Sequence, residues 1–310
     1  MLTFLVVVLV SNAMIGVTSP LVARGLAPCT ATRLIGVAAF VTTLASGFVL
    51  CIVCFDFVTQ IPTIARVGRW SAGSFNSDDP VPVACGLACC LVLLAVVVLV
   101  IRRSAALAGD LWSSAAACRR FPPFTGQLVV VDDPEPDAYA LPGWRGGHIV
   151  VTSGMLGVLD ADEQQVLLAH EASHLRHRHH AYVALATLAA AANPLCRAVP
   201  AVVRTSAERW ADEDAAQATG DRRLAARAVA RAGLESAKAK RAHRGTLALG
   251  MSDSQVAQRA KALMAPPAPT RPLSLAVAAA LVLVTMVGAF GAALTTEHRF
   301  ERAHASYLQQ

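Results

Sequence analysis

The sequence predicts a mainly α-helical, polytopic membrane protein with about four transmembrane helices and one polar α+β domain. Hydrophobic residues make up 55% of the 310 residues and charged residues only 15%, whereas soluble domains average roughly 25% charged residues. The apolar residues gather in four segments, each near the roughly 20 residues that cross a bilayer. Nearly all hydrophilic residues lie between the third and fourth segments. This composition excludes an intrinsically disordered chain, which needs low hydrophobicity and high charge.

The four apolar segments are the predicted transmembrane helices. They are Leu2–Val17, Leu34–Val58, Val83–Ile101 and Leu273–Leu294. Ser11 and Asn12 interrupt the first segment, for which a cleaved signal peptide is the alternative. The segment has no basic residues before its apolar run, and this favours a retained helix.

The arginines near the segment ends predict the orientation of the chain. Placing the dense arginine clusters in the cytoplasm puts the N-terminus outside and the polar domain inside. We therefore expect a multi-pass protein of the plasma membrane. Its expected parts are a membrane region with three helices (1–101), a cytoplasmic domain (102–265), a Pro-rich linker (266–272), a fourth transmembrane helix (273–294) and a short tail (295–310). The net charge of +6 is then mostly a topology signal, and no direct contact with nucleic acid is expected.

The polar domain begins with extended segments and continues with helices. Gln127–Val131 and His148–Thr152 are rich in β-branched residues and predict strands, and Tyr139–Leu141 predicts a brief extended piece between them. From Ser153 onward the periodicity is helical. Asp160 begins a helix whose first turn is acidic, as the positive end of a helix dipole favours.

That helix contains the string His170-Glu171-x-x-His174. Residues four apart lie on one helical face, so both imidazoles can reach one Zn²⁺ ion. Glu171 lies about 100° round the helix and can reach a water on the metal without being a ligand. A His-rich, charged helix end is the alternative, but the apolar run before His170 predicts a buried helix, in which unpaired His and Glu would be costly. We predict one Zn²⁺ per chain.

A catalytic zinc needs a third protein ligand and one open position. His180 has a suitable spacing from His170, but no helix breaker lies between His174 and His180 to turn the chain. Glu208 is the preferred candidate, on a second polar helix. Asp212 lies one turn further on the same face and can accept a hydrogen bond from the outer nitrogen of a liganding histidine.

Residues 181–203 separate the two metal helices and are Ala-rich, broken by Asn193-Pro194 and Pro200. A re-entrant segment or a hairpin at the membrane surface is predicted, because a spanning helix would put His170 and Glu208 on opposite sides of the bilayer.

These motifs resemble those of membrane-bound gluzincin metallopeptidases of the BlaR/MecR-like group, related to the HtpX/Ste24-like peptidases. The similar segments cover about half the chain: Asp137–Gly143, His148–Leu156, the His170-Glu171-x-x-His174 helix, Glu208-x-x-Ala211-Asp212 and Val256-x-x-Arg259-x-x-x-Leu263. The layout of three helices, protease domain and one helix is closest to the BlaR/MecR type, without its penicillin-binding sensor domain. The resemblance implies a zincin-like α+β metalloprotease domain with zinc on His170, His174 and Glu208, and with Glu171 as catalytic acid/base.

The expected function is that of an integral-membrane zinc endopeptidase that hydrolyses peptide bonds with a metal-activated water. Its expected partners are a protein or peptide substrate and the lipid bilayer, and regulatory proteolysis of a cytosolic transcriptional repressor is the expected role. The alternatives are HtpX-like quality control of membrane proteins and a non-proteolytic membrane signalling protein with a structural metal.

The sequence also offers candidates for the substrate-binding strand and for a second group that stabilises the oxyanion. The strand His148, Ile149, Val150, Val151 and Thr152 is expected to take up substrate as an added β-strand. His148, His177 and Tyr139 are candidates for a second group that stabilises the oxyanion.

Overall fold

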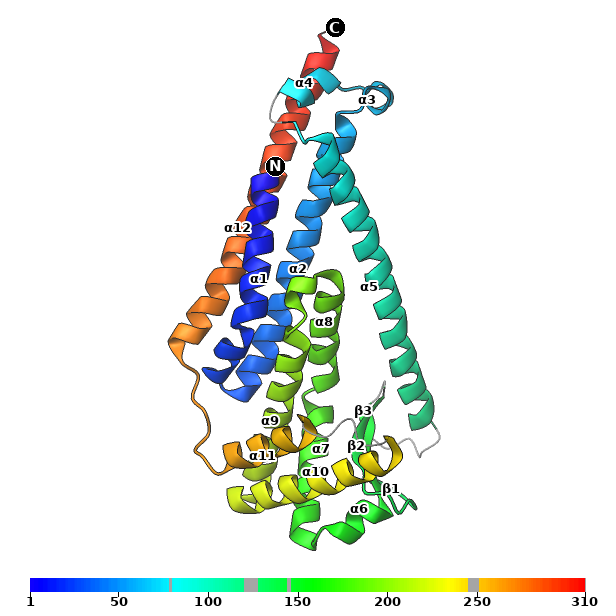
Figure 1. Ribbon diagram of the computed structural model, residues 1–310, viewed down its shortest axis with the longest axis vertical. Helices are drawn as coiled ribbons and strands as arrows, with labels where there is room; N and C mark the ends of the chain where they lie inside the picture. The colour runs from blue at the N-terminus through cyan, green and yellow to red at the C-terminus, as the bar shows by residue number, and fades with distance from the viewer. Residues whose placement is uncertain (78–79, 120–127, 144–145, 245–250, 310) are drawn as a thin grey trace.

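Four long helices carry the apolar segments and form one end of the molecule, as Figure 1 shows. They are α1 (Leu2–Arg24), α2 (Pro28–Thr59), α5 (Val83–Cys118) and α12 (Pro272–Leu308). Each is long and apolar enough to cross a membrane. The computed structural model describes all residues except 78–79, 120–127, 144–145, 245–250 and 310. The predicted fold class is therefore confirmed: the chain is mostly helical, with several apolar helices and a small sheet.

All four helices are longer than the apolar segments within them, and the difference is largest for α5 and α12. α5 continues past the predicted boundary at residue 101 as far as Cys118, and α12 continues through the predicted tail as far as Leu308. No proline interrupts either continuation, so the helix extends beyond its apolar part. The loop between α2 and α5 contains two short helices, α3 (Pro62–Gly68) and α4 (Ala72–Ser77).

α1, α2 and α12 pack together, and both chain ends lie at the end of this bundle away from the polar domain (Figure 1). Asp56 of α2 and Arg299 of α12 form an ion pair of 2.7 Å near that end, and both side chains are buried. α5 contacts α2, where Gly86 lies against Phe57, but most of its large apolar side chains are exposed. An exposed apolar helix of this length suits contact with lipid.

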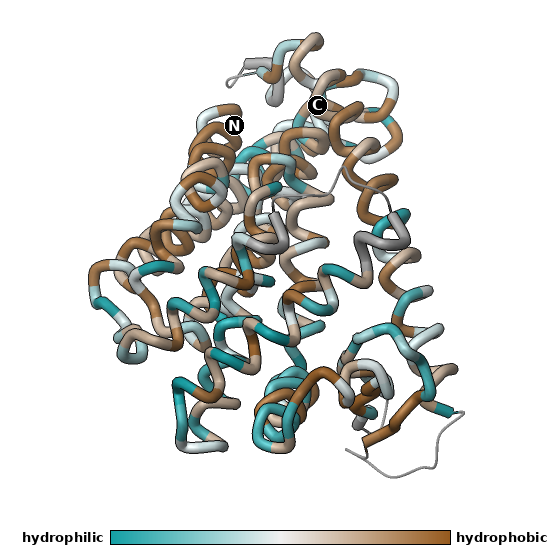
Figure 2. Tube along the Cα trace, turned by 60° about the horizontal axis from the view of Figure 1, so that its bottom comes forward, coloured by the Kyte–Doolittle hydropathy of each residue, from teal (hydrophilic) through white to brown (hydrophobic). Residues whose placement is uncertain are grey.

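A three-stranded sheet and five helices form the polar domain, whose hydrophilic residues appear teal in Figure 2. The strands are β1 (Leu128–Val131), β2 (Ala138–Gly143) and β3 (Gly146–Thr152), in the order β1-β3-β2. β3 is central, parallel to β1 and antiparallel to β2. The helices that belong to this domain alone are α6 (Ser153–Val158), α7 (Ala161–Arg176), α10 (Arg222–Arg244) and α11 (Met251–Leu263). The fifth, α9 (Val199–Thr219), also reaches the bundle.

α8 (His179–Ala192), the short 3₁₀ helix η1 (Pro194–Cys196) and α9 form a helical hairpin over the range where a hairpin was predicted. The hairpin extends from the polar domain along α2 (Figure 1). At its tip the backbone of Leu195 lies against Gly16 of α1, where a Cβ atom would be only 1.9 Å from the Leu195 carbonyl oxygen. Asn12 of α1 lies beside the same tip, with its Oδ1 atom 3.6 Å from the Cys196 thiol. The tip therefore docks on α1 through a close backbone approach that requires glycine.

This docking can be tested with Gly16→Ala. The added methyl group meets a backbone atom that no side-chain rotation can move, so we expect destabilisation by about 1–3 kcal/mol. Thermal unfolding of the detergent-solubilised protein would measure it. Gly47→Ala in α2 is the matched control, because no atom lies within 4 Å of that added Cβ. Equal unfolding temperatures for the two variants would contradict the docking.

Candidate functional site

α7 presents His170, Glu171 and His174 from the interior of the polar domain. Its N-terminus is closed by a capping box in which Asp160 and Glu163 each bind the other's backbone amide. Glu163 is fully buried and also accepts hydrogen bonds of 2.9 Å from Arg227 and from Arg231 of α10. These contacts fix α7 against α10.

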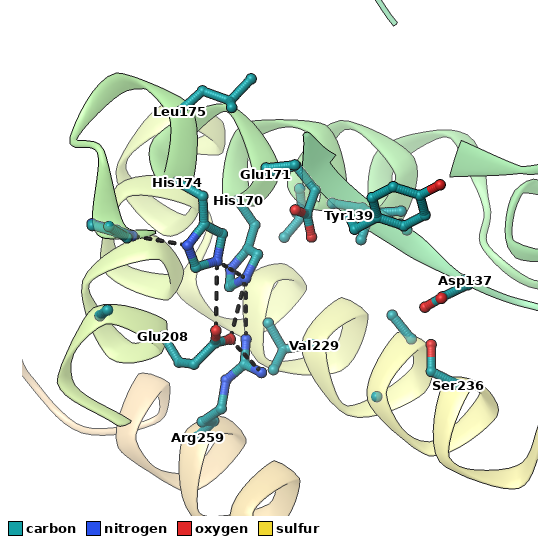
Figure 3. A pocket seen from close by; sticks show the side chains of 18 of the residues that line it. Asp137, Tyr139, His170, Glu171, His174, Leu175, Glu208, Val229, Ser236 and Arg259 are labelled. Carbon is teal, nitrogen blue, oxygen red and sulfur yellow. Dashed lines mark hydrogen bonds and ion pairs between the residues drawn. The ribbon is translucent and has the colours of Figure 1, made fainter. Parts of the chain in front are cut away.

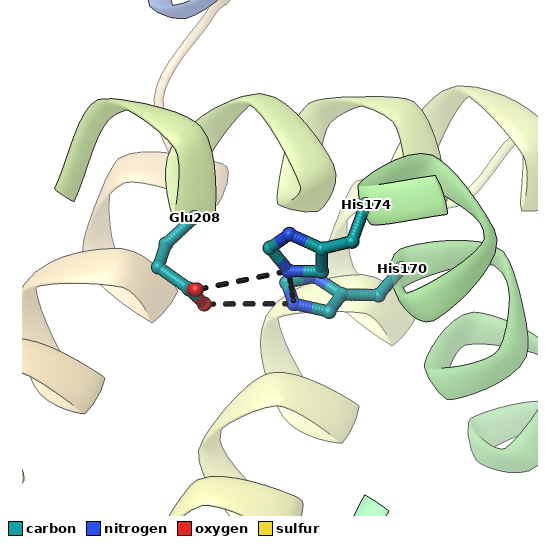
Figure 4. A group of neighbouring side chains, drawn as sticks. All are labelled: His170, His174 and Glu208. Atoms are coloured by element: carbon teal, nitrogen blue, oxygen red, sulfur yellow. Dashed lines mark hydrogen bonds and ion pairs between the residues drawn. The ribbon is translucent and has the colours of Figure 1, made fainter. Parts of the chain in front are cut away.

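Glu208 reaches the two histidines from α9, because the hairpin returns the chain to the same side of the domain (Figure 4). Its two carboxylate oxygens lie 3.6 Å from Nε2 of His170 and 3.7 Å from Nε2 of His174. The two Nε2 atoms are 3.1 Å apart. This is the one group of three histidine, cysteine or acidic side chains in the described part of the chain whose ligand atoms converge in this way.

The donor set fits a zinc ion in both chemistry and spacing. Zinc binds imidazole nitrogen and carboxylate oxygen at about 2.0–2.2 Å, so two ligands of a tetrahedral site lie about 3.3–3.5 Å apart. The three measured separations, 3.1, 3.6 and 3.7 Å, lie close to this spacing. Two imidazoles and one carboxylate leave a fourth position for water or substrate, as in catalytic zinc sites.

The outer nitrogen of His170 faces Asp212. The Nδ1 atom lies 3.0 Å from Oδ1 of this carboxylate, which is only 2% exposed. Asp212 in turn accepts hydrogen bonds of 2.6 and 2.8 Å from Arg259 of α11. Arg259 also lies 3.1 Å from Glu208. The arrangement matches the common pattern in which a carboxylate orients a metal-binding histidine.

His174 is oriented by another histidine. Its Nδ1 atom lies 2.9 Å from Nδ1 of His179, a buried residue that begins α8. The centroid of the His179 ring lies 4.8 Å from that of Trp210. The guanidinium of Arg33 in α2 lies 4.5 Å from the centroid of the same Trp210 ring. The ligand His174 is thus connected through His179 and Trp210 to a bundle helix.

The electrostatics of the protein groups suit this arrangement. Burial disfavours a charge on His170, but contacts with Asp212 and Glu208 raise its pKa to about 10. Burial and the nearby His170 lower the pKa of His174 to about 4. Burial raises the pKa of Glu171 above its usual range. The carboxylates therefore attract a positive charge to this point, and Glu171 is able to hold a proton.

The histidines and Glu171 open into a cavity of about 540 Å³, shown in Figure 3. Glu171 points into it beside Tyr139 of β2. Tyr139 is the candidate oxyanion-stabilising residue that lines the cavity, whereas His148 is buried in β3 and His177 binds Asp214 at 2.9 Å. His180 also lines the cavity but is not part of the metal-binding group.

The expectation for the substrate strand is corrected by the sheet. The strand His148, Ile149, Val150, Val151 and Thr152 forms most of β3, whose residues 149–152 pair with β1 on one side and whose residues 146–151 pair with β2 on the other. A strand paired on both sides has no free edge for an added strand. β2 lies at the sheet edge, and three of its residues in succession, Ala138, Tyr139 and Ala140, line the cavity.

Sequence reasoning missed the positions of His179 and Arg259. Arg259 lies in one of the segments that resemble the peptidases, and His179 follows the metal-binding helix without a ligand spacing of its own. His179 lies five residues after His174, beyond the break between α7 and α8. At this break Arg178 adopts a left-handed conformation with φ 51°.

The role of His179 leads to a prediction for metal affinity. His179→Phe keeps an aromatic ring against Trp210 but removes the acceptor for His174, so we expect zinc affinity to fall about 10- to 100-fold. Competition with a chromophoric chelator measures it. His180→Phe, at the adjacent exposed position, is the control and is expected to bind zinc as the natural chain does. Unchanged affinity in His179→Phe would contradict the positioning role.

Comparison with known proteins places these residues within a family. Residues 108–264, just over half of the chain, match the model of Peptidase family M48. The chain is 40% identical over 70 residues to a protease HtpX homolog of Pyrobaculum calidifontis, a match that covers 22% of this chain and 20% of that protein. It is 44% identical over 54 residues to a protease HtpX homolog of Acidiphilium cryptum, covering 17% of this chain and 18% of that protein.

These matches are local, because the chain aligns with only about a fifth of the length of the relatives. No solved structure matches the chain significantly. The family match, however, spans α7, α9 and α11, the helices that carry the metal-binding group and Arg259. The chain belongs to peptidase family M48.

Proposed function

We propose that the protein is an integral-membrane zinc endopeptidase whose catalytic group is Glu171 and whose zinc ligands are His170, His174 and Glu208. The observation that carries this proposal is the convergence of the three ligand side chains from α7 and α9 beside a buried glutamate in one cavity. Membership of a peptidase family and the HtpX homologues support it.

The mechanism follows from where the side chains lie. When bound, zinc supplies a Lewis acid that polarises a water molecule and the scissile carbonyl group. Glu171 takes a proton from the attacking water on its carboxylate and then delivers that proton to the departing amine. Its raised pKa suits this exchange, because burial stabilises the protonated form.

β2 gives the substrate a place to bind. As an edge strand that lines the cavity, it offers main-chain groups to an extended peptide, which would add to the sheet as a fourth strand. Recognition of this kind depends on the main chain more than on side chains. Tyr139 lies on this strand and is the candidate for stabilising the oxyanion.

Two biological roles are compatible with this activity. Residues of the hairpin, among them Val183 and Arg204, line the cavity, and together with the HtpX homologues this favours cleavage of membrane proteins. The three-plus-one arrangement of apolar helices, which is similar to that of BlaR/MecR-like proteins, favours cleavage of a cytosolic repressor. Both roles place the catalytic domain in the cytoplasm and the four apolar helices in the plasma membrane.

Catalysis and metal binding can be separated with one substitution. Glu171→Gln keeps the size of the side chain but removes its ability to accept the proton, so we expect peptidase activity to fall by about 10²–10⁴-fold. Zinc content, measured on the same purified protein, should stay at one ion per chain. His170→Ala is the comparison variant and should lose both. Full peptidase activity in Glu171→Gln would show that Glu171 is not the catalytic group. A natural chain that binds one zinc ion but cleaves no peptide would leave a non-proteolytic signalling protein with a structural metal as the alternative.

The substrate class can be tested in cells. We would compare new protein N-termini across the proteome between cells that carry the natural chain and cells that carry Glu171→Gln. Glu171-dependent ends in membrane proteins are expected from the first role, and ends in a DNA-binding repressor from the second. An identical set of N-termini in both strains would count against both roles.

A further inference from the structure

One face of α9 remains exposed from the hairpin tip to the metal site. The opposite face is buried and includes Val199, Val203 and Trp210. The exposed face continues from Arg197, which precedes α9 in helical conformation, to Glu208. The residues between them on this face, all exposed, are Ala201, Arg204 and Thr205. Their spacing of three to four residues keeps them on one side of the helix.

The hairpin that carries this face extends deep into the helix bundle. Trp210, near the metal site, lies against Arg33 at the start of the apolar part of α2, and Cys196 at the hairpin tip lies 3.9 Å from Thr43 of the same helix. Ten residues of α-helix from Arg33 to Thr43 span about 15 Å. The hydrocarbon core of a bilayer is about 30 Å thick. If α2 spans the membrane, the tip and Arg197 reach about half of that thickness.

The two arginines on this face make no ion pair with an acidic residue in the described part of the chain, whereas Arg259 at the metal site pairs with Glu208 and Asp212. Glu208, one turn from Arg204, already contacts His170, His174 and Arg259. An arginine at membrane depth is costly unless it meets an acidic group or water. Arg197 and Arg204 are therefore available to an acidic partner from outside the chain.

The exposed face of α9 opens into the catalytic cavity. Arg204 lines this cavity together with His180 and Val183 of α8. A peptide that lies along α9 from the tip would therefore reach the zinc ligands and the edge of β2 without leaving the surface of the protein. The face connects the depth of the bundle to the site of cleavage.

We propose that the exposed face of α9 (Arg197, Ala201, Arg204, Thr205) binds a membrane-spanning segment of the protein substrate, and that its two arginines select acidic side chains in that segment. This inference rests on the proposed peptidase function and adds a substrate preference to it. The spacing of the arginines also sets a register. Seven helical residues span about 10.5 Å, and a helical span of the substrate covers this distance with the same number of residues.

The test uses the full-length, zinc-loaded protein in lipid nanodiscs and a single-span model substrate. One Asp is moved along the span, with Asn and Lys at the same positions as comparisons. We expect kcat/KM about tenfold higher for Asp than for Asn at two positions about seven residues apart. Arg204→Glu should transfer the preference to Lys at the position nearer the cleaved bond, and Arg197→Glu should do so at the deeper one. Arg223→Glu, on α10 and outside the cavity, should keep the natural pattern.

A second measurement does not depend on cleavage. Ala201→p-benzoylphenylalanine in the Glu171→Gln background places a photo-crosslinker on the exposed face, and we expect it to capture the Asp-containing span. Gln217→p-benzoylphenylalanine, exposed near the other end of α9, is the control and should not capture it.

The outcomes separate this inference from the proposed function. Glu171-dependent cleavage with equal rates for Asp, Asn and Lys, and no crosslink from position 201, would overturn the inference and leave the peptidase intact. A crosslink from position 201 without cleavage of any substrate would support the binding face and overturn the peptidase. Absence of both cleavage and crosslink would overturn both.

Discussion

The carboxylate of Asp212 connects the three helices on which the site depends. It lies on α9, accepts two hydrogen bonds from Arg259 of α11 and faces Nδ1 of His170 on α7. Because it is almost fully buried, it needs these partners to remain charged. Contacts with Arg259 and His170 keep its pKa below the usual range despite burial. A single buried charge thus holds together helices that are distant in sequence and orients one metal ligand.

The second ligand depends on the bundle instead. His174 contacts His179, whose ring packs on Trp210, and Arg33 of α2 covers that tryptophan. The hairpin that carries His179 and Trp210 is itself held at its tip by Gly16 and Asn12 of α1. The geometry of the metal site is therefore coupled to the packing of apolar helices. Separate production of the polar domain would remove Arg33 and the contacts at the hairpin tip.

The hairpin allows the apolar chain between the two ligand-bearing helices to return to the metal site. Both ligand-bearing helices must lie on one side of the membrane, yet the chain between them is apolar. Turning at η1 returns α9 to the side of α7 and lets the apolar residues pack on α1 and α2. At the turn, the side-chain oxygen of Asn193 accepts a hydrogen bond from the Leu195 amide. A hairpin that enters the bundle in this way leaves one face of α9 uncovered.

Features that depend on local periodicity could be predicted from the sequence: four apolar helices, the capped helix that starts at Asp160, and the positions of His170 and His174 one turn apart. The sequence also offered Glu208 as a candidate ligand with Asp212 on the same helical face, and the structure brings both side chains to His170. The position of each strand in the sheet followed only from the tertiary structure, because strand order depends on pairing between distant segments. β3, which is rich in β-branched residues, lies in the centre of the sheet, and β2 lies at an edge. The tertiary structure alone brought His179 and Arg259 to the ligands, because the first is placed by the break between α7 and α8 and the second by the packing of α11 against α9 and α10. Contacts between distant segments have no periodic signal in one sequence, and these residues were therefore visible only in the folded chain.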